Sequence, residues 1–209
     1  MNKLFILGMG PGNKDYVLPV TTLAINSCDV LVGGVRHLKE YETLGKTMIP
    51  LDKDIDRVME LIRENIKDKR VALLLSGDTG FYSMLKYLRK EFKPEELEVI
   101  PGISSFQYLA ARIGETWQDA YVGSLHGRVL DLEPLLRKHS RIYLLTDSNN
   151  SPQQIAKKII GYGVKKITMV VGENLSYENE RIIEATPQEI IEQLNFEMAV
   201  VVIKVEVEL

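Results

Sequence analysis

The sequence contains a single cysteine, Cys28, among its 209 residues, so an internal disulfide bond cannot form. Chains without disulfides are typical of reducing compartments, and we expect a cytoplasmic protein. Long apolar runs are lacking as well. No stretch approaches the ~20 residues of a membrane-spanning helix, and the first residues lack the pattern of a signal peptide. We therefore expect a soluble protein with no membrane partner.

A large excess of charge of one sign is also missing, because the chain has 26 basic and 29 acidic residues and a net charge of -3. The sequence has no basic stripe and no polybasic cluster, so we expect no nucleic-acid partner. Any anionic ligand must be met by a few local arginines. The cysteine and histidine spacing of a metal site is absent too, and no bound metal is expected.

What the sequence does contain is an alternation of short apolar runs and helix-like segments. The apolar runs 4–7, 71–75 and 97–100 are typical of buried strands in a parallel sheet. Between them, residues 54–66 carry an apolar residue every three or four positions, which predicts an amphipathic helix. A second helix-like pattern, 16–27, is interrupted by Pro19. The alternation predicts the α/β class.

The length permits two domains. A polar stretch follows Gly114, and we place the boundary there, with an N-terminal α/β domain over 1–114 and a C-terminal α/β domain over 115–209. The last apolar run, 198–207, has alternating charges toward its end. That pattern predicts a strand at the edge of a sheet.

Three predicted strands run into glycine-rich loops that precede helices. The loops are Gly8-Met-Gly10-Pro11-Gly12, Ser76-Gly77-Asp78-Thr79-Gly80 and Pro101-Gly102-Ile103-Ser104-Ser105. In an open parallel sheet such loops collect at one edge, where ligands bind. The first loop is not a dinucleotide fingerprint, because Asn13 stands where the third glycine belongs. The Gly-Lys-Ser/Thr of a phosphate-binding loop is also absent.

The ligand that remains is a nucleoside without a polyphosphate, and S-adenosylmethionine fits that description. Asp78 could compensate the sulfonium or amino charge of this cofactor. Ser104 and Ser105 offer hydroxyls and helix N-terminal amides to its carboxylate.

Together with Gly172-Glu173-Asn174-Leu175, this ordered set of motifs resembles the tetrapyrrole methylase family of S-adenosylmethionine enzymes. The resemblance implies two α/β domains with the active-site cleft between them, a parallel N-terminal sheet, a mixed C-terminal sheet, a tetrapyrrole substrate and a homodimer. The segments 32–38 and 124–128 resemble the subgroup that methylates carbon 5 of precorrin-7, or of its cobalt form, in cobalamin biosynthesis. Thr79 departs from the Gly-Asp-Pro that many members carry, which puts the rigidity of the second loop in question.

The motifs and the resemblance together give the candidate site residues. The cofactor-binding set is Gly77, Asp78, Gly80, Tyr82, Ser104, Ser105, Ser124 and Leu125. The substrate-binding set is Gly10, Pro11, Gly12, Arg36, His37 and Arg128. For the second set, the resemblance implies that the first loop forms a floor for the macrocycle, and the cationic side chains could pair with its acetate and propionate groups. His126 is the candidate catalytic base, with water as the alternative.

Other readings remain open at this level. A relative could methylate a different tetrapyrrole carbon, a protein or an RNA. A nicotinamide-dependent oxidoreductase and a cofactor-sensing module are the alternatives outside the family. Arg36 and His37 could instead form a solvated helix start, and Glu173 could face the site or serve the fold. Any cobalt would arrive inside the substrate.

Overall fold

The computed structural model describes residues 2–164 and 166–206. By its contacts the chain divides into a first unit that ends at Ser104 and a second that begins at Ser105. Helix α5 (Ser105–Arg112) therefore groups with the second unit, where it packs against strands of the second sheet. The domain boundary expected after Gly114 stays a prediction.

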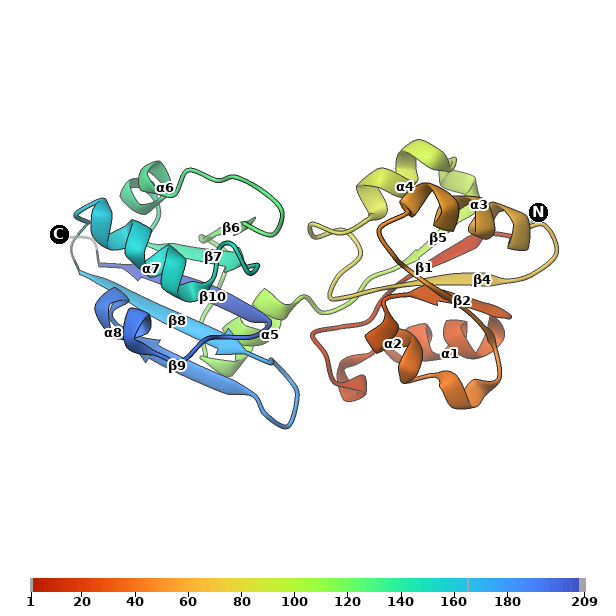
Figure 1. Cartoon of the computed structure of the whole chain (residues 1–209), viewed down its shortest axis with the longest axis horizontal. Coiled ribbons are helices and arrows are strands. Elements are labelled where there is room, and N and C mark those ends of the chain that lie inside the picture. The colour runs from red at the N-terminus through yellow and green to blue at the C-terminus, as the bar shows by residue number, and fades with distance from the viewer. Residues whose placement is uncertain (1, 165, 207–209) are drawn as a thin grey trace. The chain divides into compact units, whose positions relative to one another are not determined.

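The first unit is a three-layer α/β/α structure around a five-stranded, all-parallel sheet (Figure 1). The sheet order is β3-β2-β4-β1-β5. Its strands are β1 (Leu4–Gly8), β2 (Val30–Gly33), β3 (Thr47–Pro50), β4 (Val71–Leu75) and β5 (Leu97–Ile100). Helices α1 (Pro19–Ser27) and α2 (Val35–Lys39) cover one face, and α3 (Ile55–Asn65) and α4 (Leu85–Glu91) cover the other. Short 3-10 helices span Lys14–Tyr16, Glu42–Leu44 and Pro94–Glu96.

The predicted strands and the amphipathic helix of this unit are confirmed. Every residue of β4 is buried, because helices cover both faces of the sheet. The apolar face of α3 presents Val58, Met59 and Ile62 to the core. Its N-terminus is capped by Asp54, whose Oδ1 accepts the N–H of Arg57 at 3.1 Å.

Helix α1 differs from the expectation that Pro19 interrupts it. Pro19 is its first residue. Proline suits that position, since the first helical N–H has no intrahelical partner and the ring fixes a helical φ. At the other end the Lys46 ammonium donates to the carbonyl oxygens of Asn26 and Cys28, which satisfies two groups that the helix leaves unpaired.

The second unit is built on a five-stranded mixed sheet with the order β6-β7-β10-β8-β9. Its strands are β6 (Tyr121–Ser124), β7 (Arg141–Leu145), β8 (Ile167–Glu173), β9 (Arg181–Ala185) and β10 (Ala199–Val205). Strands β6 and β7 pair in parallel, whereas β10 pairs with β7 and β8, and β8 with β9, in antiparallel fashion. Helices α6 (Glu133–Lys138), α7 (Pro152–Gly161) and α8 (Pro187–Glu192) share one apolar core with the sheet, and α5 contacts β7 and β10. The α/β class, with a parallel first sheet and a mixed second sheet, is confirmed.

The prediction that the last strand lies at a sheet edge is wrong. Strand β10 is the central strand, paired with β7 on one side and β8 on the other. Its run Val200–Ile203 is at most 3% exposed, and this apolar run outweighs the charge alternation at the end of the strand. Lys204 is accommodated there because its ammonium pairs with Glu115 at 3.2 Å and Glu184 at 3.0 Å. Residues 207–209 lie outside the described residues.

The topology of the first sheet fixes where a ligand binds. After β1 the chain moves to β2 and β3 on one side, whereas after β4 it crosses to β5 on the other. The order of the strands therefore reverses between the neighbours β4 and β1. In open α/β sheets the crevice at such a switch point, at the carboxyl ends of the strands, receives the ligand.

Candidate active site

The first two glycine-rich loops meet at this switch point and pair with each other. Gly10 N–H donates to the Gly77 carbonyl oxygen at 3.2 Å, and Gly77 N–H donates to the Gly10 carbonyl oxygen at 2.8 Å. Both residues have positive φ values, +73° and +67°, which glycine adopts at little cost. The sequence therefore places glycine where the backbone turns and where the loops pair.

The third loop packs directly against the other two. A Cβ on Gly8 would lie 2.8 Å from the carbonyl carbon of Pro101, and a Cβ on Gly102 would lie 2.8 Å from that of Gly8. A Cβ on Gly102 would also overlap the Gly77 carbonyl oxygen. The three loops thus contact one another through bare backbone, and the prediction that they gather at one sheet edge is confirmed.

Asp78 ties the second loop to the third. Its Oδ1 accepts the N–H of Gly80 at 2.8 Å, and its Oδ2 accepts the N–H of Gly102 at 3.2 Å. Thr79, the residue that put the rigidity of this loop in question, is 2% exposed. The two hydrogen bonds of the Asp78 carboxylate therefore hold the second loop against the third.

Tyr82 lies two residues after the second loop, in a conformation unusual for its residue type. Its φ is +50°, and its ring makes an edge-on contact with Phe81 at a centroid distance of 4.8 Å. The tyrosine is 44% exposed. Backbone strain of this kind concentrates at ligand-binding segments, and an exposed aromatic ring offers a flat apolar surface to a ligand.

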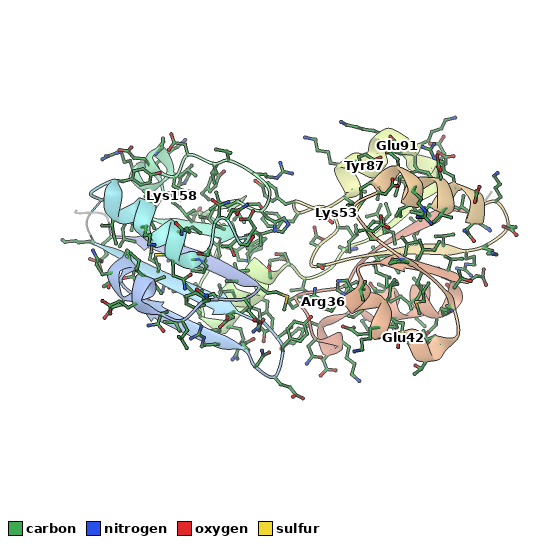
Figure 2. All side chains as sticks on the ribbon, in the orientation of Figure 1. Arg36, Glu42, Lys53, Tyr87, Glu91 and Lys158 are labelled. Carbon is green, nitrogen blue, oxygen red and sulfur yellow. The ribbon has the colours of Figure 1, made fainter. Side chains whose placement is uncertain are left out.

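Two residues at the start of α2 reach over to the end of β4. His37 Nε2 lies 2.8 Å from the hydroxyl oxygen of Ser76, and Arg36 Nη2 donates to the same oxygen at 3.3 Å. Figure 2 labels Arg36 on the α2 side of the first unit. His37 is 4% exposed, and burial together with the Arg36 charge lowers the pKa of its imidazole to about 4. At neutral pH His37 is therefore uncharged. The alternative of a solvated helix start does not describe this histidine.

The serines of the third loop differ in exposure. Ser104 is 3% exposed, whereas Ser105, the first residue of α5, is half-buried. The first loop is similar in this respect, since Gly10 and Gly12 are buried and Pro11 is half-buried.

In the second unit, the segment after β6 is held by the segment after β7. Gly127, with a φ of +62°, donates its N–H to Asp147 Oδ2 at 2.7 Å. Asp147 Oδ1 accepts the N–H groups of Asn149 and Asn150 at 3.0 and 2.8 Å. These hydrogen bonds lower the pKa of the Asp147 carboxyl, and the bond from Gly127 has the largest effect.

His126 is oriented by two hydrogen bonds within this arrangement. Its backbone N–H donates to Ser124 Oγ at 3.1 Å, and its Nδ1 lies 3.2 Å from the carbonyl oxygen of Thr146. A carbonyl can only accept, so Nδ1 carries a proton in this contact, and in the neutral imidazole the lone pair is then on Nε2. The side chain is exposed, so that lone pair is accessible.

The remaining candidates of the second unit divide between core and surface. The Leu125 side chain is 1% exposed and belongs to the core, so only its backbone is available to a ligand. Arg128 is exposed. Glu173 accepts hydrogen bonds from Arg181 Nε at 2.8 Å and from the Glu197 N–H at 2.6 Å, which is the structural role weighed for it.

Two site residues, Ser76 and Asp147, were missed at the sequence level. Ser76 directly follows β4, and Asp147 lies two residues after the end of β7, so position relative to these strands could have identified both. Within 2–164 and 166–206 no group of three or more His, Cys, Asp or Glu side chains could hold a metal ion. No helix in the same ranges is long and apolar enough to cross a membrane.

A parallel α/β unit whose bare-backbone loops converge at its switch point defines an enzyme class that binds a small molecule at the carboxyl ends of its strands. The comparison with family models makes this specific. Residues 3–191 match the Tetrapyrrole (Corrin/Porphyrin) Methylases. The protein belongs to this family, and the nicotinamide alternative is thereby dropped.

Individual relatives agree with this assignment. The cobalt-precorrin-7 C(5)-methyltransferase of Salmonella typhimurium is 37% identical over 179 residues, which cover 86% of this chain and 88% of that protein. The crystal structure of a precorrin-6Y methylase from Archaeoglobus fulgidus has a TM-score of 0.75 at 23% identity and covers 98% of this chain and 99% of that chain. The uroporphyrin-III C-methyltransferase of Thermus thermophilus, solved with S-adenosylhomocysteine, has a TM-score of 0.76 at 20% identity, with 97% and 92% covered.

Proposed function

We propose that this protein transfers a methyl group from S-adenosylmethionine to carbon 5 of cobalt-precorrin-7, a step of cobalamin biosynthesis. The observation that carries the proposal is the 37% identity to a methyltransferase of that specificity over 86% of the chain. Because the match also covers 88% of the relative, it concerns nearly whole proteins and not a shared module.

The residues at the edge of the first sheet fit the cofactor. Asp78 uses one lone pair on each oxygen for the loops, so its charge and further lone pairs remain available to a cationic group. Gly77 and Gly80 expose backbone beside it, and Tyr82 adds an aromatic surface. Ser104, Ser105, Ser124 and the backbone of Leu125 complete the proposed cofactor-binding set.

S-adenosylmethionine, when bound, supplies a methyl group already activated by its sulfonium. The protein therefore has to orient the ring carbon in line with the C–S bond and to exclude water. As the new C–C bond forms, the electrons of the C–S bond leave with sulfur, and carbon 5 then loses its proton. No redox partner is required.

His126 is proposed as the group that accepts this proton. The contact between its Nδ1 and Thr146 supports the role, because Nε2 then carries the lone pair that a general base needs. The hydrogen bonds of Asp147 hold the same loop in place, which limits the motion of the imidazole.

The macrocycle carries acetate and propionate groups, and Arg36 and Arg128 are proposed to pair with them through guanidinium–carboxylate hydrogen bonds. The first loop, Gly10-Pro11-Gly12, is proposed as the floor beneath the ring. It has few side-chain atoms, so a flat ligand could approach its backbone closely.

We also propose that the protein is a cytoplasmic homodimer. The exposed apolar side chains Val20 and Leu23 on α1, 50% and 69% exposed, support an interface on that helix. Light scattering after size exclusion measures the mass directly. A monomeric wild-type protein would exclude the dimer.

The function is tested by incubating the protein with cobalt-precorrin-7 and S-adenosylmethionine labelled with ¹³C in its methyl group. The expected product carries the label on carbon 5, located by NMR. A label on another carbon would replace this specificity with that of a different tetrapyrrole methylase. Calorimetry should also show binding of S-adenosylhomocysteine and none of NAD; the reverse result would end the proposal.

A further inference from the structure

The hydroxyl of Ser76 is held at the end of β4 by two side chains from another part of the chain. Strand β2 lies beside β4 in the sheet, and α2 follows β2 directly, so Arg36 and His37 come close to the first residue after β4. Ser76 itself is exposed, whereas His37 is almost completely buried. The arrangement therefore places the hydroxyl of an exposed residue in contact with an almost completely buried imidazole.

The hydrogen bonds that the Ser76 hydroxyl already makes limit which further hydrogen bonds it can form. A serine oxygen has one proton to donate and two lone pairs to accept with. Arg36 is permanently charged and has no acceptor, so its contact at 3.3 Å occupies one lone pair. The role of the proton then depends on the contact with His37 Nε2 at 2.8 Å.

The neutral imidazole of His37 has two forms, and they lead to opposite outcomes. If Nε2 carries the hydrogen, the Ser76 oxygen accepts from both neighbours and its own proton points away from them. If Nδ1 carries it, the Ser76 proton is donated to Nε2 and a lone pair faces outward instead. The first form places a hydroxyl donor beside the guanidinium of Arg36, and that pair is complementary to an anion.

We propose that the Ser76 hydroxyl donates a hydrogen bond to a carboxylate of the tetrapyrrole substrate, beside Arg36, and that His37 is a positioning residue that orients this hydroxyl through Nε2–H. The choice of substrate rests on the proposed function. In this arrangement His37 does not touch the substrate, which agrees with its 4% exposure. The low pKa of His37 keeps the imidazole neutral beside Arg36. Both tautomers meet that condition, and the variants below distinguish them.

The test compares Ser76→Ala, Ser76→Thr, His37→Gln and His37→Leu. The dissociation constant of cobalt-precorrin-7 is measured by absorbance titration with S-adenosylhomocysteine present, and KM and kcat are measured separately. Ser76→Ala and His37→Leu should raise the dissociation constant and KM about tenfold, because a hydrogen bond to a charged group is lost or misdirected. The kcat should stay within about twofold, since carbon 5 itself is untouched.

The conservative variants separate positioning from a general structural effect. Ser76→Thr keeps the hydroxyl, and His37→Gln offers an amide N–H in place of Nε2–H, so both should stay within about threefold of the wild type. The affinity for S-adenosylhomocysteine should be unchanged throughout, which reports an intact first unit. The matched control is Ser140→Ala. Ser140 is an exposed serine directly before the amino end of β7, whereas Ser76 follows the carboxyl end of β4.

Three results would overturn the inference. The first is an unchanged dissociation constant in Ser76→Ala. The second is a loss of affinity in His37→Gln as large as in His37→Leu. Such a result would mean that Nε2 accepts a hydrogen bond from Ser76 and does not donate one. The third is a fall in kcat alone.

If the wild type neither binds nor methylates cobalt-precorrin-7, the proposed function fails, and the same variants are titrated with uroporphyrin III. A loss there in Ser76→Ala supports carboxylate recognition, and no loss overturns it.

Discussion

Gly10 and Gly77 exchange a pair of backbone hydrogen bonds, of 3.2 and 2.8 Å, across the switch point of the first sheet. This pair extends the contact between β1 and β4 beyond the last residues of both strands. Both glycines have positive φ, so the contact depends on a backbone conformation that other residues adopt only under strain. The geometry of the site is thus built mainly into the main chain.

The first prediction concerns Gly10→Ala. A Cβ at this position would meet the carbonyl oxygen of Tyr16 at 2.8 Å, in addition to the strain of a φ of +73°. We expect the free energy of unfolding to fall by about 2–4 kcal/mol, from the left-handed conformation and the overlap together. Chemical denaturation measures the change.

The matched control is Gly45→Ala. Gly45 has a φ of +64°, but no atom lies within 4 Å of its Cβ position. Only the conformational cost applies there, about 1–2 kcal/mol. Equal losses in the two variants would mean that the contact with Tyr16 contributes nothing.

The second prediction concerns Asp78. Asp78→Ala removes the acceptor for the N–H groups of Gly80 and Gly102, together with the charge proposed for the cofactor. We expect the dissociation constant of S-adenosylhomocysteine to rise at least about tenfold in calorimetry. Asp78→Asn keeps one acceptor oxygen, so its dissociation constant should lie between those of the wild type and Asp78→Ala.

Asp52→Asn is the control for this experiment. Asp52 accepts the N–H of Asp54 at 2.8 Å in a similar turn, but it lies before α3 and outside the three loops. The affinity of the Asp52→Asn protein for S-adenosylhomocysteine should equal that of the wild type. An Asp78→Ala protein that still binds within twofold of wild type would remove Asp78 from the cofactor-binding set.

The sequence predicted the order and type of the elements well, because these depend on local patterns. Strand β4 is recognisable from its unbroken apolar run, and α3 from its apolar period. The place of β10 in its sheet was predicted wrongly. Whether a strand lies at the centre or the edge depends on pairing with β7 and β8, which are distant in sequence. A few charges at its end carried no information about that pairing.

The same limit applies to the site. The glycine loops could be found because a strand, a tight turn and a helix follow one another within a few residues. The contact of Ser76 with His37 joins residues 39 apart, and that of Asp147 with Gly127 joins residues 20 apart. Each pair depends on which strands become neighbours. Local spacing therefore identified the loops but not the side chains that support them.

The third prediction concerns Asp147→Ala. Without the acceptor for the Gly127 N–H, the loop that carries His126 loses one of the hydrogen bonds that join it to the segment after β7. Misplacement of a reacting group by about 1 Å can cost up to a hundredfold in rate, so we expect kcat to fall about tenfold or more. Steady-state kinetics with cobalt-precorrin-7 measures the loss.

A double variant distinguishes positioning from a separate role. If Asp147 acts by holding His126, then adding Asp147→Ala to His126→Ala should lower kcat little further. Asp131→Ala is the control, since Asp131 accepts only the N–H of Glu133 at the start of α6. Fully additive losses would show that Asp147 contributes independently of His126.

The fourth prediction follows from the low pKa of His37, about 4 in the folded protein against a usual value of 6.5. Between these two pH values the unfolded chain binds more protons than the folded one. Stability should therefore fall as the pH decreases from about 6.5 to 4, by about 2–3 kcal/mol in total, and this loss should be absent above pH 7. Denaturation curves at pH 4.5, 5.5 and 7.5 measure the slope.

His37→Gln isolates this contribution, because glutamine does not titrate. The difference in unfolding free energy between wild type and variant should change with pH in that window and stay constant above it. His139→Gln, which replaces a half-buried histidine beside Tyr121, is the control and should follow the wild-type slope. A direct check is the NMR titration of the His37 ring. A midpoint near 6.5 would mean that the imidazole is charged under mildly acidic conditions, and burial beside Arg36 would then not keep it neutral.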